Sequence, residues 1–181
     1  MKHKMSTYKN KLLGICVTLA ILIVTGSAFS GPKGIQVVLL TPSEVVLAKG
    51  DISEFALEYN VLNGEAKTTG LGLRIYFNSS VLSRLTFKNV FTDGLIAQEE
   101  TAQNDADDLD NDPLTDKYLN IAWLGINADW PNSGQLPIRL GTIVFQIHQN
   151  IKTPSTTLNV KSTSTPAGYV FSGEGASITI K

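Results

Sequence analysis

The chain has 181 residues, of which 43% are hydrophobic and 17% charged, and its formal net charge at pH 7 is −1. This length is sufficient for one domain with a substantial hydrophobic core. The charge balance argues against nucleic acid and anionic membrane surfaces as partners, because both attract proteins that neutralise their phosphates with clustered basic residues.

The first thirty residues have the features of a secretory signal peptide. Four lysines lie within the first eleven positions, and an almost uninterrupted apolar run follows from Leu12 to Val24. Ala28 and Ser30 place small residues at the two positions that signal peptidase reads. The apolar run is about 13 residues long, whereas a membrane span needs about 20, so we expect cleavage rather than a membrane anchor.

Cleavage after Ser30 leaves residues 31–181 as a secreted or periplasmic protein. It removes four of the 15 basic residues, so that 11 basic residues face 16 acidic ones and the net charge becomes −5. It also removes Cys16, the only cysteine, which excludes a disulfide, a thiolate metal site and a cysteine nucleophile. Ile15 stands where a lipoprotein signal needs a small residue, so we expect no lipid attachment and no membrane association after cleavage.

Strand signals dominate the rest of the chain. Residues 54–61 and 71–77 alternate between apolar and polar side chains, which is typical of half-buried strands. Further strands are expected at Ile35 to Leu40, Val45 to Leu47, Val81 to Phe87, Tyr118 to Ile126, Ile138 to Ile147, Thr156 to Val160 and Ala176 to Ile180. About nine short strands, mostly separated by turn residues, predict an all-β single domain, either a β-sandwich or a barrel.

The longest stretch without a strand signal runs from Asp93 to Lys117, and connections of this length are often functional or mobile. It contains a candidate metal site. Calcium takes six to eight oxygen ligands, and carboxylates at alternate positions of an irregular loop can converge on one ion. The candidate ligands are Asp105, Asp107, Asp108, Asp110, Asp112 and Asp116.

Two residues exclude an EF-hand in this loop. Pro113 stands where that motif needs glycine, and Leu119 stands where it needs a bidentate glutamate. The alternative to a metal site is a solvated acidic loop. Because six neighbouring carboxylates without a counterion repel one another, we favour calcium. Magnesium fits less well, since it prefers few protein ligands and a rigid octahedron.

The order of several motifs resembles that of the cohesin domain, including cohesin-like domains outside cellulosomes, from about Gln36 to the C-terminus. The motifs are "VVLAKGDISEFALEYNV", "TTGLGLRIYFNSSVLSRLTFKNVF", "KYLNIAWLGI" and "LPIRLGTIVFQI". The resemblance implies a nine-stranded jelly-roll sandwich, related to carbohydrate-binding modules, that binds a dockerin domain through one face. The chain departs from the pattern at Asn78, where a carboxylate is common, and in its long acidic loop.

A protein partner and a polysaccharide are the two alternatives for the ligand. Arg74 and Tyr76 alternate with Leu73 and Ile75, so we expect them to be exposed as anchors for a dockerin-like partner, although isolated residues of this type are also ordinary surface. The alternative is a carbohydrate-binding module, which stacks sugars on exposed aromatic rings.

The candidate sugar-binding rings are few. Trp130, beside Pro131, is expected in a turn, where it either caps the sandwich or contacts a sugar, and Tyr118 is a second candidate. Trp123 alternates with apolar neighbours and is expected in the core. The scarcity of exposed aromatic residues favours the protein partner.

Enzymatic activity is not expected. His148 is the only histidine after residue 30, it lies at the end of a predicted strand, and no nucleophile elbow is present. Glu99 and Glu100 supply neighbouring carboxylates, but glycoside hydrolysis needs two acids at a fixed separation on rigid elements.

Overall fold

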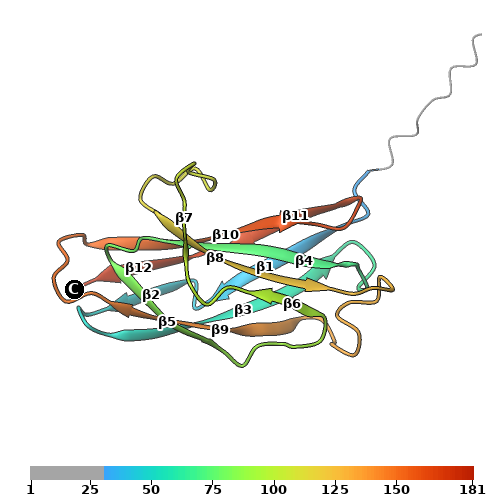
Figure 1. The fold of residues 1–181 in the computed structure, drawn as a ribbon, viewed down its shortest axis with the longest axis horizontal. Helices are drawn as coiled ribbons and strands as arrows, with labels where there is room; N and C mark the ends of the chain where they lie inside the picture. The colour runs from blue at the N-terminus through green and yellow to red at the C-terminus, as the bar shows by residue number, and fades with distance from the viewer. Residues whose placement is uncertain (1–30) are drawn as a thin grey trace, which may run out of the picture.

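The structure is a computed structural model that describes residues 31–181, so the predicted signal peptide lies outside the described residues. Figure 1 shows strands arranged in two layers, with a loop that projects from one side of them. Within residues 31–181 the regular elements are all strands, and no helix there has the length and apolarity needed to span a membrane.

The described part of the chain forms twelve strands. They are β1 (Gly34–Thr41), β2 (Glu44–Leu47), β3 (Ile52–Leu62), β4 (Gly70–Phe77), β5 (Leu82–Lys88), β6 (Leu95–Gln98), β7 (Gln103–Asn104), β8 (Lys117–Leu124), β9 (Ile138–Ile147), β10 (Ser155–Ser164), β11 (Tyr169–Glu174) and β12 (Ala176–Ile180).

The strands form two sheets, which confirms the prediction of an all-β sandwich. One sheet has the order β11-β1-β3-β9-β5, and the other has the order β2-β12-β10-β4-β8-β6, with β7 paired to the beginning of β8. The pairs β1–β11 and β2–β12 are parallel, and the other pairs are antiparallel. Sequence neighbours such as β4 and β5 therefore lie in different sheets, as in a jelly roll.

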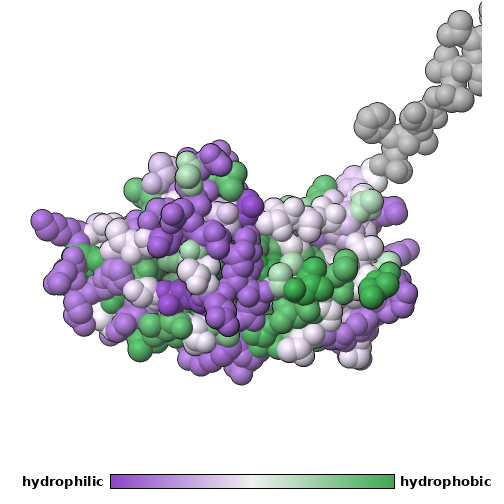
Figure 2. Space-filling view, in the orientation of Figure 1, coloured by the Kyte–Doolittle hydropathy of each residue, from purple (hydrophilic) through white to green (hydrophobic). Residues whose placement is uncertain are grey.

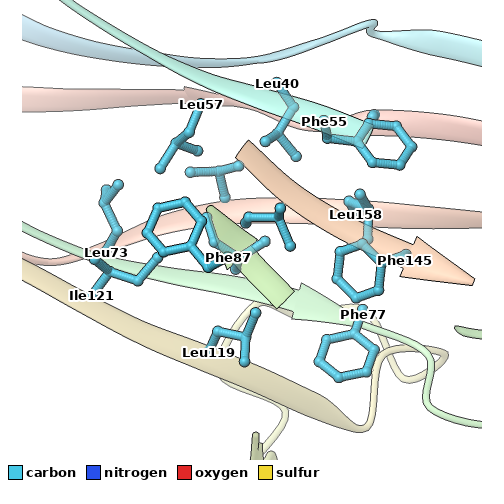
Figure 3. Packing of buried hydrophobic residues seen from close by; sticks show 14 of the residues in the cluster. Leu40, Phe55, Leu57, Leu73, Phe77, Phe87, Leu119, Ile121, Phe145 and Leu158 are labelled. Carbon is cyan, nitrogen blue, oxygen red and sulfur yellow. The ribbon is translucent and has the colours of Figure 1, made fainter. Parts of the chain in front are cut away.

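The hydrophobic core lies between the two sheets. Leu40, Phe55 and Leu57 enter it from the first sheet, and Leu73 and Phe77 enter it from the second (Figure 3). Side chains on a strand alternate between its two faces, so every second residue of these strands faces the core. The remaining residues of β4 and β8 point outward, and they form the face on which the candidate site is built.

Three short strands were absent from the sequence-based prediction. β6 and β7 lie inside the stretch from Asp93 to Lys117, and each holds its place by pairing with β8. β11, with the sequence YVFSGE, is rich in residues that weaken a strand signal, and it forms by pairing with β1. β8 ends at Leu124, two residues earlier than predicted, and Ile126 beyond it is 92% exposed.

Candidate functional site

The outer face of the second sheet carries Arg74 and Tyr76 on β4, opposite to the buried Leu73 and Ile75. The prediction that Tyr76 is exposed is wrong, because only 1% of its surface is accessible. Its cross-strand neighbours are Tyr118 on β8 and Asn159 on β10. The Tyr118 ring lies 5.4 Å from the Tyr76 ring, measured between centroids.

The acidic loop completes the cover over Tyr76. Asn159 donates a hydrogen bond of 2.8 Å to Asp110, which fixes the loop above this part of the sheet. Burial raises the pKa of the Tyr76 hydroxyl, while the hydrogen bond to Arg74 acts in the opposite direction. Tyr76 therefore stabilises the contact between loop and sheet and is not available as an exposed anchor for a partner.

Arg74 is half-buried on the same face and is held by its neighbours. Its Nε donates to Asn120 Oδ1 at 3.3 Å, and its Cζ lies 4.7 Å from the centroid of the Tyr118 ring. Chiefly the hydrogen bond with Tyr76, and also the nearby Asp105, raise the pKa of Arg74, so the guanidinium stays charged. Its positive charge lies beside the acidic loop and offsets part of the charge of that loop.

The base of the acidic loop is fastened to the end of β4. Asp116 accepts hydrogen bonds of 2.6 Å from both the backbone N–H and the hydroxyl of Ser79, and its own N–H donates to the Phe77 carbonyl. The N–H of Asp105 donates to the Asp116 carbonyl at 2.9 Å and closes the loop. Asp116 is thus a structural residue at the base of the loop, separate from the cluster described below.

A second set of contacts fastens the loop to β10. Asp112 accepts hydrogen bonds from Thr157 and Asn159, both at 3.1 Å, and Asp110 accepts one from Thr115 at 2.8 Å. Burial acts to raise the pKa of Asp112, but the hydrogen bonds from Leu114, Asn159 and Thr157 outweigh burial, and the net result is a lowered pKa. The ionised form of Asp112 is therefore the one that holds the loop against the sheet.

Three of the six predicted calcium ligands come together within the acidic loop. Carboxylate oxygens of Asp105, Asp108 and Asp110 lie within 4.8 Å of one another. Asp110 is buried, Asp105 is half-buried, and Asp108 is exposed with a positive φ of 50°. Asp107 is exposed and lies outside this cluster, while Asp112 and Asp116 are occupied in fastening the loop.

The two tryptophans lie in the core. Trp123 is buried, as predicted. The interpretation of Trp130 as an exposed sugar-stacking ring is wrong, because the residue is fully buried. Its ring centroid lies 4.8 Å from that of Tyr59, and its Nε1 donates to the Asp93 carbonyl at 3.1 Å. Tyr118 is half-buried beside Arg74, so these residues offer no row of exposed rings.

The structure pairs His148 with a serine that the sequence analysis did not identify. The Oγ of Ser83 lies 2.6 Å from His148 Nε2, and His148 Nδ1 lies 3.2 Å from the Ser80 carbonyl oxygen. The contacts join β5 to the end of β9. Glu99 accepts a hydrogen bond from Asn120, and the neighbouring Glu100 is exposed, so the two carboxylates have different surroundings.

Three exposed apolar residues lie at the β6–β8 edge of the second sheet: Ile96 on β6, Leu124 at the end of β8 and Ile126 just beyond it. They are called the apolar patch below. Ile96 is 62% and Leu124 46% exposed. Gly70 and Gly72 on β4 lie beside Leu124 and Ala122 on β8. Because glycine has no side chain, β4 adds none beside Leu124 and Ala122. Figure 2 shows hydrophobic side chains gathered on the side of the molecule where Figure 1 places β6. Alternation along β8 could have indicated Leu124 as an outward apolar residue.

Comparison with protein-family models and with curated proteins finds no match. Solved structures do match. CaCohA2 from Clostridium acetobutylicum superposes with a TM-score of 0.53 at 11% identity, over 83% of this chain and 92% of that one. The seventh ScaB type I cohesin from Pseudobacteroides cellulosolvens gives 0.50 at 11% identity, over 81% and 92%.

CaCohA2 in its complex with a variant of CaDoc0917 gives a TM-score of 0.51 at 13% identity, over 81% of this chain and 99% of that one. Each of these matches covers at least 81% of this chain and at least 92% of the matched chain. At these identities the comparison concerns the fold. The chain described here therefore has the β-sandwich fold of the cohesin modules.

Proposed function

We propose that this chain is a non-catalytic, secreted binding module that docks a dockerin-like protein through the outer face of the sheet containing β10, β4, β8 and β6. The apolar patch of Ile96, Leu124 and Ile126 is the observation that carries this proposal. The cohesin-like fold supports it, as does the CaCohA2 structure, which is a complex with CaDoc0917.

The composition of this face suits a protein partner. The apolar patch is bordered by the polar side chains of Arg74, Asn120 and Glu99, which are linked by hydrogen bonds. Protein interfaces commonly combine an apolar centre with a polar rim of this kind. A sugar-binding platform would need exposed rings, and both tryptophans are buried.

Calcium binding is the second part of the proposal, and it concerns the three-aspartate cluster of the acidic loop. Asp105, Asp108 and Asp110 would provide the carboxylate oxygens. Asp105 accepts from the N–H of Leu109, and Asp110 from Thr115 and Asn159, but a carboxylate offers about four lone-pair positions, so ligand positions remain. The ion would relieve the repulsion between three carboxylates and stabilise the loop that covers Tyr76.

The experiment is capture of the purified protein by a panel of immobilised dockerin modules, in calcium and in chelator. We expect at least one module to retain the protein. Retention by insoluble polysaccharide, combined with no retention by any dockerin module, would contradict the proposal and favour the carbohydrate-binding alternative. The dependence of retention on calcium tests the second part separately, provided that the chosen dockerin module keeps its own fold in chelator.

A further inference from the structure

We propose that a cavity between the beginning of β5 and the base of the acidic loop binds a carboxylate group. The cavity has a volume of about 360 Å³ and is lined by Arg84, Lys117, Glu100, Thr101, Ser79 and Ser83, with three apolar residues between them. It lies apart from the apolar patch and from the three-aspartate cluster, and it does not depend on the function proposed above.

Arg84 is the main reason to expect a ligand here. Its Nη1 donates to the Glu100 carbonyl oxygen, but its Nε is buried and has no hydrogen-bond partner. A buried donor without an acceptor costs about 1 to 3 kcal/mol, and more when the group is charged. Burial also lowers the pKa of Arg84, and the nearby Glu100 acts in the opposite direction without offsetting the effect of burial.

The residues that line the cavity carry more positive than negative charge. Salt bridges within residues 31–181 join Lys88 to Glu54 and Arg139 to Glu58, so neither Arg84 nor Lys117 is neutralised in this way. The one carboxylate that lines the cavity belongs to Glu100, which is exposed. The lining thus holds two cations and one acid, and the Asp116 carboxylate lies next to it, hydrogen-bonded to the lining Ser79.

The geometry of the donors favours a carboxylate over a spherical anion. The edge of a guanidinium that carries Nε presents two parallel N–H groups, and these match the two oxygens of a carboxylate. Lys117 contributes a second charge, and Thr101 a hydroxyl. The hydroxyls of Ser79 and Ser83 already contact Asp116 and His148, so they contribute less.

The test is a titration of the ¹⁵N-labelled protein with sodium acetate, followed through the Nε–Hε resonance of Arg84, with sodium chloride at equal ionic strength as the reference. We expect a saturable shift with acetate and none of comparable size with chloride. Lys117→Gln should weaken acetate binding at least threefold. Lys88→Gln, which removes the same charge from the other end of β5, should leave it unchanged.

Arg84→Gln should abolish the acetate-dependent shift of the Ala102 amide, which lies at the same cavity. If that variant does not fold, the Lys117→Gln result decides the matter. A shift that is equal in chloride, does not saturate, or is unaffected by Lys117→Gln would overturn the proposal. Galacturonate and N-acetylaspartate carry the same group on a sugar and on a peptide-like molecule, and their relative affinities distinguish a saccharide from a protein source.

Discussion

Trp130 illustrates how the environment of a single residue changes its interpretation. In the sequence it lies among turn residues, which suggested exposure as readily as burial. In the structure its backbone pairs with Thr68, and this bridge turns the ring inward against Tyr59. A bridge between residues 62 positions apart leaves no local signal, so sequence reasoning could not choose between the two alternatives.

We predict that Trp130→Ala lowers the free energy of unfolding by about 3 to 5 kcal/mol, the usual cost of removing a large buried ring. Tyr118→Ala, at a half-buried ring on the outer face, should cost clearly less. Urea denaturation of both variants measures the difference. An equally stable Trp130→Ala protein would show that the ring is not part of the core.

Asp108 belongs to the three-aspartate cluster and its neighbour Asp107 does not, so the two residues provide a matched pair for testing calcium binding. Binding to the folded state alone adds about 2.7 kcal/mol at a hundredfold excess of ion over Kd. We therefore expect the Tm of the wild-type protein to rise with calcium and hardly with magnesium.

Asp108→Asn should remove most of this rise, whereas Asp107→Asn should retain it, since Asp107 lies outside the cluster. Thermal melts in calcium and in chelator check both variants. Identical wild-type melting curves under the two conditions, with no heat of binding by calorimetry, would leave the loop as a solvated acidic segment.

At the level of elements, the ionised Asp112 of the acidic loop holds this loop against β10 by accepting hydrogen bonds from Thr157 and Asn159. The pKa of Asp112 is lowered from 3.8, so its contribution to stability is complete above that value and is lost as the pH falls through the lower, folded-state value. We predict that the difference in free energy of unfolding between wild type and Asp112→Asn stays constant from about pH 7 to about pH 4 and shrinks in more acidic solution.

Denaturant titrations at a series of pH values measure this difference. Asp107→Asn serves as the control, because the exposed Asp107 makes no contact with β10 and should differ little from wild type throughout. A difference for Asp112→Asn that grows in acid would have the opposite sign and would contradict the assignment of the ionised form as the one that fastens the loop.

The strands of the core could be predicted because their apolar residues alternate, as in residues 54–61 and 71–77. The burial of Tyr76 under the acidic loop could not be predicted. Alternation indicates which side of a sheet a residue occupies, but it does not show whether a distant loop lies on that side. Arg84 lies two residues after the buried Leu82, and this spacing could have indicated an arginine turned toward the sandwich. The three-aspartate cluster was predicted in part, because spacing identifies possible ligands without showing which of them fasten the loop.

At the level of the whole molecule, two sheets provide outer faces of different character. The face of the second sheet is divided between the acidic loop, which covers one part, and the apolar patch, which remains open. A partner that docks here would bury Leu124 and Ile96 beside the polar rim. Leu124 on β8 and Leu85 on β5 are both 46% exposed, but they lie on different sheets. The same substitution at Leu85 is therefore a control for the substitution at Leu124.

The most direct test of the account is the affinity for a captured dockerin module, measured by calorimetry for wild type, Leu124→Asp and Leu85→Asp. A charge placed in the apolar centre should weaken binding more than tenfold, about 1.4 kcal/mol, while Leu85→Asp should bind as wild type does. Both variants should unfold near the wild-type temperature, because both residues are exposed. Equal affinity of Leu124→Asp and wild type, or binding by no dockerin module at all, would contradict the proposed docking face.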